Sequence, residues 1–283
     1  MQDHSVQCLS PSGLHHLHYT EWGERDNPRV VICVHGLTRN CRDFDTLAQT
    51  LAKDCRVICP DVVGRGQSAW LADAQHYALP QYIADMTTLI ARVTACGARE
   101  ILWLGTSMGG MIGMLLASMA HTPISRLVVN DVGLMIPKAS LERIAKYVGL
   151  SPKFNTMHEM NAYVRFISAP FGPLTDAQWS HLTIHNSKQD AEGRWTMNYD
   201  PGIAAPFQKG PIVDLDLTHY YDQIRCPTLL LRGTDSDLLL KDTALAMTAR
   251  GPKAKLVEFA GIGHAPMLMA DDQIKVVQEF LLT

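Results

Sequence analysis

The chain has 283 residues, of which 47% are hydrophobic and 19% are charged, and its formal net charge is −3. This composition can bury a large core, and the weak negative charge disfavours binding to nucleic acid or to an anionic membrane surface. No apolar stretch typical of a signal peptide opens the chain, and no run reaches the length of a membrane helix. We therefore expect a cytoplasmic protein whose seven scattered cysteines stay reduced.

The first half of the chain alternates between strand and helix patterns. An edge strand is expected at residues 14–22, which alternate in polarity. Short β-branched apolar runs then predict buried strands at residues 29–34, 56–60, 100–105 and 126–130. Between them, apolar residues at helical spacing predict helices at residues 43–53, 81–96 and 110–120. Alternation of this kind indicates an α/β protein with a parallel sheet covered by helices on both faces.

The pattern changes after Pro137. Residues 139–217 contain helical stretches and many aromatic residues but no β-branched strand run. Strand patterns return at residues 227–232 and 254–259, and a last helix is expected at residues 271–282. The sequence therefore predicts a sheet domain that is interrupted by a helical cap.

A possible nucleophile lies where the third buried strand meets a helix. The segment Gly105-Thr-Ser-Met-Gly109 is a G-x-S-x-G motif in the strand–turn–helix context that gives this motif its meaning. The sharp turn would expose the hydroxyl of Ser107, and the helix N-terminus behind it would favour negative charge on a tetrahedral intermediate. Side chains at either flanking glycine would collide with the neighbouring elements. We therefore predict Ser107 as a catalytic nucleophile.

A second turn, His35-Gly36-Leu37, directly follows the first buried strand. Its small residues would let the backbone amide of Leu37 point toward the same place as the amide of Met108. Two such N–H groups form an oxyanion hole, and one donor contributes about 3–4 kcal/mol to lowering the barrier. Leu37 and Met108 are therefore the predicted oxyanion donors.

The activating base should be a histidine on a late loop. His264 lies between the last strand pattern and the last helix, with glycines before it that allow the loop to bend. The carboxylate that orients this histidine should follow a strand. Asp235 and Asp237 follow the strand at 227–232, and Asp131 is a third candidate after the strand at 126–130. A capping or turn role is the simpler interpretation of Asp131.

Three histidines near the N-terminus resemble a metal cluster at first sight. His15, His16 and His18 fall on the first expected strand, but no cysteine or acidic residue lies beside them at the spacing of a zinc site. The favoured interpretation is an exposed hairpin strand. We expect neither a metal nor an organic cofactor.

At this point the sequence resembles the α/β-hydrolase superfamily, close to its bacterial esterases and cap-bearing hydrolases. The resemblance extends from about Trp22 to the end and includes the segments at residues 60–68, 130–133 and 231–237. It implies an eight-stranded, mostly parallel sheet with helices on both faces and a lid inserted after the sixth strand. The implied core comprises residues 1–133 and 218–283, with the cap at 134–217. In relatives that end the late strand with R-G-x-x-S-D, the last aspartate is the triad acid, which favours Asp237 over Asp235.

The same resemblance implies a carboxylic-ester hydrolase that works through an acyl-enzyme intermediate. The many aromatic and several methionine residues of the cap favour a small-molecule ester of a small or medium, mainly apolar acyl group as substrate. Arg39 and Asn40 follow the oxyanion turn, and Trp70 follows the loop at residues 64–66, so all three are candidate substrate contacts. Alternatives that stay open are a carbon–carbon bond hydrolase of ring-cleavage products and a ligand-binding receptor. The sequence leaves the oligomeric state open.

Overall fold

The computed structural model describes all residues 1–283, and its centre is an eight-stranded sheet with the order β1-β2-β4-β3-β5-β6-β11-β12. The strands are β1 (Gln2–Ser10), β2 (Gly13–Trp22), β3 (Arg29–Val34), β4 (Arg56–Pro60), β5 (Glu100–Thr106), β6 (Ile124–Asn130), β11 (Thr228–Gly233) and β12 (Lys255–Phe259). Pairing is parallel from β4 through β12, whereas β1 and β2 form an antiparallel hairpin on the β4 edge. The predicted mostly parallel sheet is confirmed.

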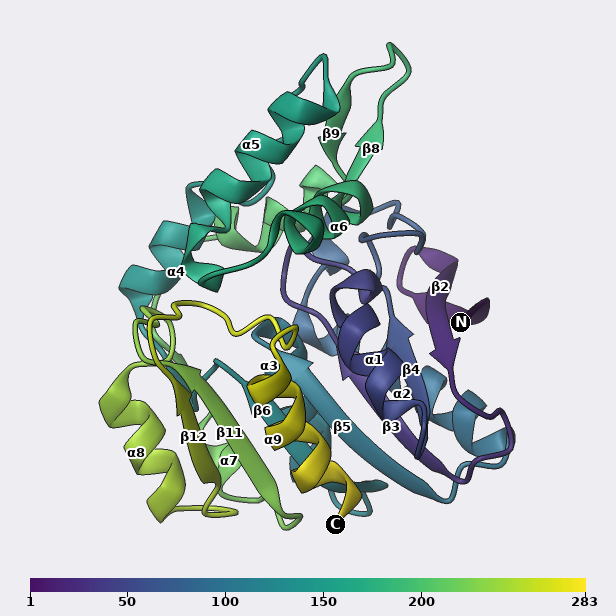
Figure 1. Cartoon of the computed structure of the whole chain (residues 1–283), viewed down its shortest axis with the longest axis vertical. Coiled ribbons are helices and arrows are strands. Elements are labelled where there is room, and N and C mark those ends of the chain that lie inside the picture. The colour runs from purple at the N-terminus through teal and green to yellow at the C-terminus, as the bar shows by residue number, and fades with distance from the viewer.

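Helices cover both faces of this sheet. On β3, Val30, Ile32 and Val34 belong to one apolar cluster, and the alternate residues Val31 and Cys33 belong to another. The first cluster includes residues of α2 (Leu79–Ala95) and α3 (Met108–Ser118). The second includes residues of α1 (Asp45–Leu51) and α9 (Asp271–Leu282), which cross in front of the strands in Figure 1. Strands buried on both faces explain the uninterrupted apolar runs.

An inserted segment projects from the carboxyl edge of the sheet. After β6, the short strand β7 (Met135–Ile136) pairs with β10 (Leu215–Asp216), so the chain leaves and returns through a two-stranded stalk. Between them lie α4 (Lys138–Ala145), α5 (Met157–Ile167), η3 (Ala169–Phe171), α6 (Asp176–Asn186), β8 (Ser187–Gln189), β9 (Trp195–Met197) and η4 (Pro201–Gln208). Figure 1 shows this segment as the upper part of the molecule. It is therefore mainly helical but also contains the antiparallel β8–β9 hairpin.

The remaining elements complete the sheet body. They are η1 (Cys41–Phe44), η2 (Ala74–His76), α7 (Thr218–Tyr221) and α8 (Lys241–Ala249). All seven cysteines are free thiols. No helix combines the length and the apolar character that crossing a bilayer would need.

Candidate active site

Ser107 occupies a strained turn between β5 and α3. Its backbone has φ 53° and ψ −114°, a conformation that a residue with a side chain rarely adopts and that is found most often at functional sites. The flanking glycines are sterically required. A Cβ on Gly105 would lie 2.1 Å from the carbonyl oxygen of Gly109, and a Cβ on Gly109 would lie 2.0 Å from that of Val34. The turn can therefore form only because both flanking residues lack side chains.

His264 reaches this serine from the loop between β12 and α9. Its Nε2 lies 3.0 Å from Ser107 Oγ, although 157 residues separate the two along the chain. The imidazole is one-fifth exposed, so the pair is open to a bound molecule. The structure thus brings together the two residues that the sequence predicted as nucleophile and base.

The carboxylate beside His264 belongs to Asp131. His264 Nδ1 donates to Asp131 Oδ2 at 2.8 Å. Asp131 follows β6 directly, has a positive φ of 55° and is completely buried. The backbone N–H of Gly233 and the hydroxyl of Ser236 also donate to its carboxylate, at 3.0 and 2.6 Å. These donors fix the orientation of the Asp131 carboxylate.

The expectation that Asp237 orients the histidine is wrong. The side chain of Asp237 is 57% exposed and pairs with Arg143 of α4 at 2.9 Å. Asp235 is exposed as well, and its carboxylate accepts a hydrogen bond from the neighbouring Thr234. The loop after β11 contributes Ser236 and Gly233 to the site as donors to Asp131 rather than contributing an acid. Asp131 was among the sequence candidates, and its position directly after a buried strand was the signal for it.

The predicted oxyanion donors lie at the carboxyl ends of neighbouring strands. Met108 is the first residue of α3, where the backbone N–H has no partner within the helix. The N–H of Leu37 donates to no other backbone group. Gly36 joins this turn to the nucleophile, because a Cβ placed on Gly36 would lie 3.7 Å from Ser107 Cβ. The structure therefore places the turn that carries Leu37 against Ser107.

His35 holds that turn in place from a fully buried position. Val62 N–H donates to its Nε2 at 2.9 Å, which leaves the hydrogen on Nδ1 for the carbonyl of Gly36 at 2.7 Å. That carbonyl and the N–H of Leu37 belong to one peptide group and point in opposite directions. Fixing the carbonyl therefore aims the N–H. Burial lowers the pKa of His35 to about 4, so its imidazole is neutral at physiological pH.

Of the three predicted substrate contacts, Arg39 shares with the nucleophile a close approach to Gly36. The point where a Gly36 Cβ would sit is within 4 Å of both Arg39 Cγ and Ser107 Cβ. Two nitrogens of Arg39, Nε and Nη2, donate to Asp43 at 2.8 and 2.7 Å. Its guanidinium lies 5.3 Å from the centre of the Phe171 ring in the inserted segment. Nη1 forms no hydrogen bond within the protein and is available to a ligand.

The prediction for Asn40 is wrong, because its side chain is buried and fully engaged. Its Nδ2 donates to the carbonyl of His185 at 2.9 Å and to Asn186 Oδ1 at 3.1 Å, and its Oδ1 caps the N–H of Arg42. Asn40 therefore joins the sheet body to α6. Trp70 is 48% exposed and lies under the ammonium of Lys188, 4.0 Å from the ring centre. Its contact with substrate stays a prediction.

The inserted segment packs onto the loop that carries His264. Gly263 N–H donates to the carbonyl of Pro170 at 2.7 Å, immediately before the histidine. Trp179 and Leu182 of α6 form an apolar cluster with Met267 and Met269 just after it. Figure 1 shows this loop directly below the inserted segment. The segment thus borders the site from above.

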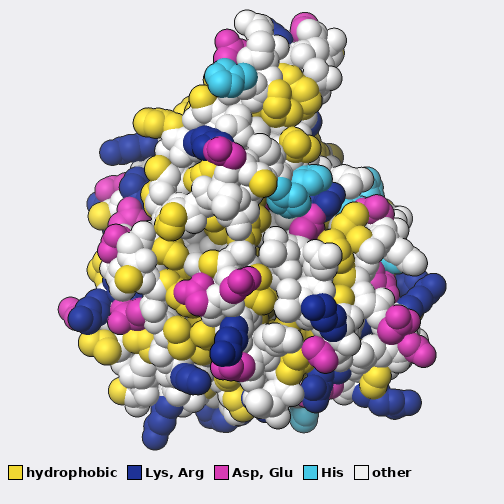
Figure 2. All heavy atoms as spheres, viewed as in Figure 1, with side chains coloured by type: hydrophobic (Ala, Val, Ile, Leu, Met, Phe, Trp, Pro, Cys, Tyr) yellow, Lys and Arg dark blue, Asp and Glu magenta, His cyan; other side chains and the backbone are white.

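Charged and imidazole side chains connect α6 to the sheet body at one edge of this junction. His181 Nε2 donates to the carbonyl of Arg42 at 2.9 Å, and Asp45 accepts a bidentate bond from Arg42. Figure 2 shows histidine, basic and acidic side chains grouped at the step between the projecting part and the sheet body. The imidazoles of His181 and His185 and the carboxylate of Asp45 lie close enough to share an ion. Arg42 already neutralises that carboxylate, which opposes metal binding there.

We expected the three N-terminal histidines on an exposed strand, but the structure buries two of them. His15 and His18 are buried, and only His16 is exposed. His15 Nε2 contacts Asp85 of α2 at 3.1 Å, and His18 Nδ1 contacts Asp61 at 2.8 Å. These carboxylates come from distant segments, which sequence spacing could not reveal. Both pairs fasten the β1–β2 hairpin to its neighbours.

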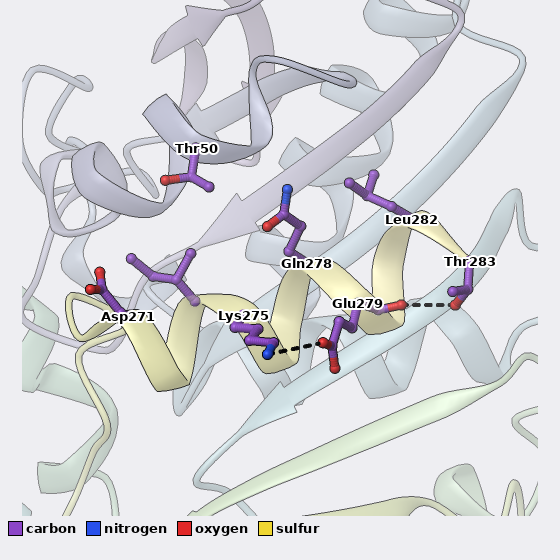
Figure 3. Close-up of a pocket in the computed structure, with 8 residues that line it drawn as sticks. Thr50, Asp271, Lys275, Gln278, Glu279, Leu282 and Thr283 are labelled. Carbon is purple, nitrogen blue, oxygen red and sulfur yellow. Dashed lines mark hydrogen bonds and ion pairs between the residues drawn. The ribbon is translucent and has the colours of Figure 1, made fainter.

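A surface pocket elsewhere on the molecule is unrelated to these residues. It lies along α9 and is lined by Asp271, Lys275, Gln278 and other α9 residues together with Thr50 of α1 (Figure 3). Lys275 and Glu279, one turn apart on α9, form an ion pair at 3.8 Å. Neither Ser107 nor His264 lines this pocket, so we do not assign it to the chemistry.

Comparison with known proteins agrees with this fold. The model of the alpha/beta hydrolase family matches residues 31–276. The chain is 46% identical to a 3-hydroxybutyrate-oligomer hydrolase from Cupriavidus necator over 97% of this chain and 96% of that protein. It is 26% identical to an esterase from Mycobacterium tuberculosis over 79% and 72% of the two chains. A crystal structure of a hydrolase from Rickettsia typhi superposes with a TM-score of 0.92 at 32% identity, covering 100% and 99%.

The chain therefore belongs to the alpha/beta hydrolase family. Its relatives are named as hydrolases and esterases, which supports an ester-hydrolysing enzyme.

Proposed function

We propose that this chain is a serine hydrolase that cleaves carboxylic esters, with Ser107 as nucleophile, His264 as general base and Asp131 as the orienting carboxylate. The observation that carries the proposal is the continuous contact from Ser107 Oγ through His264 to Asp131, at 3.0 and 2.8 Å. His264 takes the proton of Ser107 as the hydroxyl attacks the acyl carbonyl. Asp131 holds the imidazole in the required tautomer and stabilises the imidazolium that forms.

The rest of the cycle uses the same groups. The amides of Leu37 and Met108 donate to the oxyanion of the tetrahedral intermediate. His264 then protonates the departing alcohol, and a water activated by His264 hydrolyses the acyl-enzyme. We propose no metal and no organic cofactor, because each proton that moves in these reaction steps has a donor or an acceptor among the named residues.

For the substrate we propose short oligoesters of small hydroxy acids. The relative from Cupriavidus necator is named for the hydrolysis of 3-hydroxybutyrate oligomers, and it aligns along nearly its full length. Such a molecule carries small, mainly apolar acyl units and ends in a free carboxylate. Arg39 and Ser107 both approach Gly36, and Nη1 of Arg39 is unbonded, so we propose that Arg39 binds an oxygen of the substrate. A planar guanidinium suits carboxylate binding.

The inserted segment has a role in this proposal. We propose that residues 134–217 form a cap domain on a core made of residues 1–133 and 218–283, and that the cap limits the size of the acyl group. Phe171 over Arg39 and Pro170 beside the His264 loop support a covering role. The free thiols support a reducing, cytoplasmic location.

Purified protein tests the proposal directly. We expect turnover of short p-nitrophenyl esters and of the 3-hydroxybutyrate dimer and trimer, and labelling of Ser107 by a fluorophosphonate probe. The Ser107→Ala variant should lose both properties while its circular dichroism spectrum stays that of the wild type. Activity confined to a vinylogous diketone would instead indicate a carbon–carbon bond hydrolase. Absence of both turnover and labelling would indicate a ligand-binding protein.

A further inference from the structure

Three arginines are buried in this protein, and one of them has no acidic partner. Arg56 donates to Glu21 at 2.7 Å, and Arg232 donates to Glu258 at 2.6 Å. Arg65 is 0% exposed but forms no ion pair with any carboxylate. A buried charge without a counter-ion is costly and therefore uncommon. This guanidinium requires an explanation beyond packing.

Neutral groups bind the guanidinium of Arg65 on every side that the structure shows. Nη1 donates to the carbonyl of Val63 at 2.7 Å and to the hydroxyl of Tyr82 at 3.0 Å. The rings of Tyr82 and Tyr77 lie 5.0 and 5.8 Å from its central carbon, which is within the range of cation–π attraction. These contacts satisfy the donors of Nη1 but pair the guanidinium with no negative charge.

The two remaining partners of Arg65 are the residues of the proposed oxyanion hole. Nε donates to the carbonyl of Leu37 at 2.8 Å, and Nη2 donates to the sulfur of Met108 at 3.7 Å. One rigid, planar group thus connects the turn after β3 to the start of α3. These are the two segments whose amides must converge on a single oxygen atom.

We propose that Arg65 is the positioning residue of the oxyanion hole, which it serves by fixing Leu37 relative to Met108 and by placing an unpaired positive charge behind them. This inference rests on the proposed ester hydrolysis. Negative charge develops on the substrate carbonyl oxygen only in the tetrahedral transition state, and in a dry site a nearby cation favours it strongly. Arg65 does not touch the substrate, so its effect falls on the chemical step more than on binding.

The experiment compares Arg65→Met and Arg65→Lys with the wild type and with Arg56→Met as the matched control. Arg56 is equally buried but is paired with Glu21, on the β2 side of the sheet.

For a p-nitrophenyl ester we expect Arg65→Met to lower kcat about 100-fold with KM changed less than about 3-fold. A trifluoromethyl ketone, which forms a tetrahedral adduct with Ser107, should lose affinity in parallel. Arg65→Lys keeps the positive charge but cannot contact both Leu37 and Met108, so its kcat should lie between those of the wild type and Arg65→Met. Arg56→Met should lose stability but keep kcat.

A purely structural role of Arg65 predicts a different result. In that case folded Arg65→Met and Arg65→Lys would keep kcat and the affinity for the ketone, which would overturn the proposal. If neither variant folds, Tyr82→Leu removes both a hydrogen bond and an aromatic face from the guanidinium. We expect a several-fold lower kcat at unchanged KM from that variant, and a wild-type kcat would overturn the proposal equally. Wild-type protein that neither hydrolyses esters nor reacts with fluorophosphonate would instead defeat the underlying function, and this inference with it.

Discussion

The carboxylate of Asp131 accepts a hydrogen bond from His264 Nδ1 at 2.8 Å, across 133 residues of sequence. The interaction depends on two segments that end at the same edge of the sheet. Asp131 follows β6, and the loop of His264 follows β12, with β11 between these strands. Gly233, at the end of β11, permits the approach, because a Cβ there would lie 2.3 Å from the carbonyl oxygen of Ile262. The strand β11 therefore lies between the segments that carry Asp131 and His264, and its last residue lets the two side chains meet.

The first prediction ranks the acidic residues. Asp131→Asn should lower kcat by about 10,000-fold, because a neutral amide cannot stabilise the imidazolium and favours the wrong tautomer. Asp237→Asn should leave kcat within about 2-fold, because the exposed Asp237 pairs only with Arg143 at the surface. Steady-state kinetics on a p-nitrophenyl ester, with circular dichroism to establish folding, measures both. A larger loss of kcat in Asp237→Asn than in Asp131→Asn would indicate that Asp237, in the loop after β11, is the orienting carboxylate.

The second prediction concerns pH and His35. Burial lowers its pKa to about 4 in the folded chain, whereas an unfolded histidine titrates near 6.5. Above about pH 6.5 the imidazole of His35 is neutral in both the folded and the unfolded chain, so its full contribution to the free energy of unfolding is present. As the pH falls from 6.5 toward 4, only the unfolded state takes up the proton, so the free energy of unfolding should decrease by about 3 kcal/mol.

The control for this prediction is His35→Gln, which can still accept from Val62 and donate to Gly36 but does not titrate. Urea denaturation of both proteins at several pH values isolates the contribution of His35, because all other histidines cancel in the difference. We expect the wild type to lose more stability than the variant between pH 6.5 and 4. Parallel curves would show that His35 has the same pKa in the folded and unfolded chain, which would contradict the lowered pKa.

The third prediction tests the corrected role of Asn40. Its buried amide joins η1 to the end of α6, so Asn40→Ala should lower the free energy of unfolding by about 1–3 kcal/mol. KM for a small ester should stay within about 2-fold, since the side chain has no donor left for substrate. A strongly raised KM at unchanged stability would restore Asn40 as a substrate contact.

The buried strands were predictable because their residues must be apolar on both faces, as at β3 and β6. The edge strand β1 (Gln2–Ser10) was missed because most of its side chains are exposed and polar. Ser107 and His264 were predictable because glycines mark the turns that carry them. The carboxylate beside His264 was mispredicted because three candidate aspartates follow strands, and only the packing of loops decides which carboxylate is buried against the imidazole. The burial of Arg65 was not predicted, although its segment at residues 60–68 contributed to the family resemblance, since an arginine is ordinarily exposed.

The last prediction compares alanine substitutions at two glycines near Ser107, Gly109 and Gly36. Gly109→Ala should prevent folding or cost several kcal/mol, because its Cβ would stand 2.0 Å from the backbone oxygen of Val34, between two elements that cannot separate without breaking the core. Gly36→Ala meets only ordinary contacts, at 3.6 Å from Arg39 Cγ and 3.7 Å from Ser107 Cβ, and should fold with near-native stability. Because the new methyl group would lie between the nucleophile and Arg39, we expect Gly36→Ala to lower kcat/KM while its thermal midpoint stays close to that of the wild type. Thermal melts and ester kinetics on both variants decide the matter. A stable Gly109→Ala enzyme would contradict the close approach of α3 to β3 on which the position of Ser107 depends.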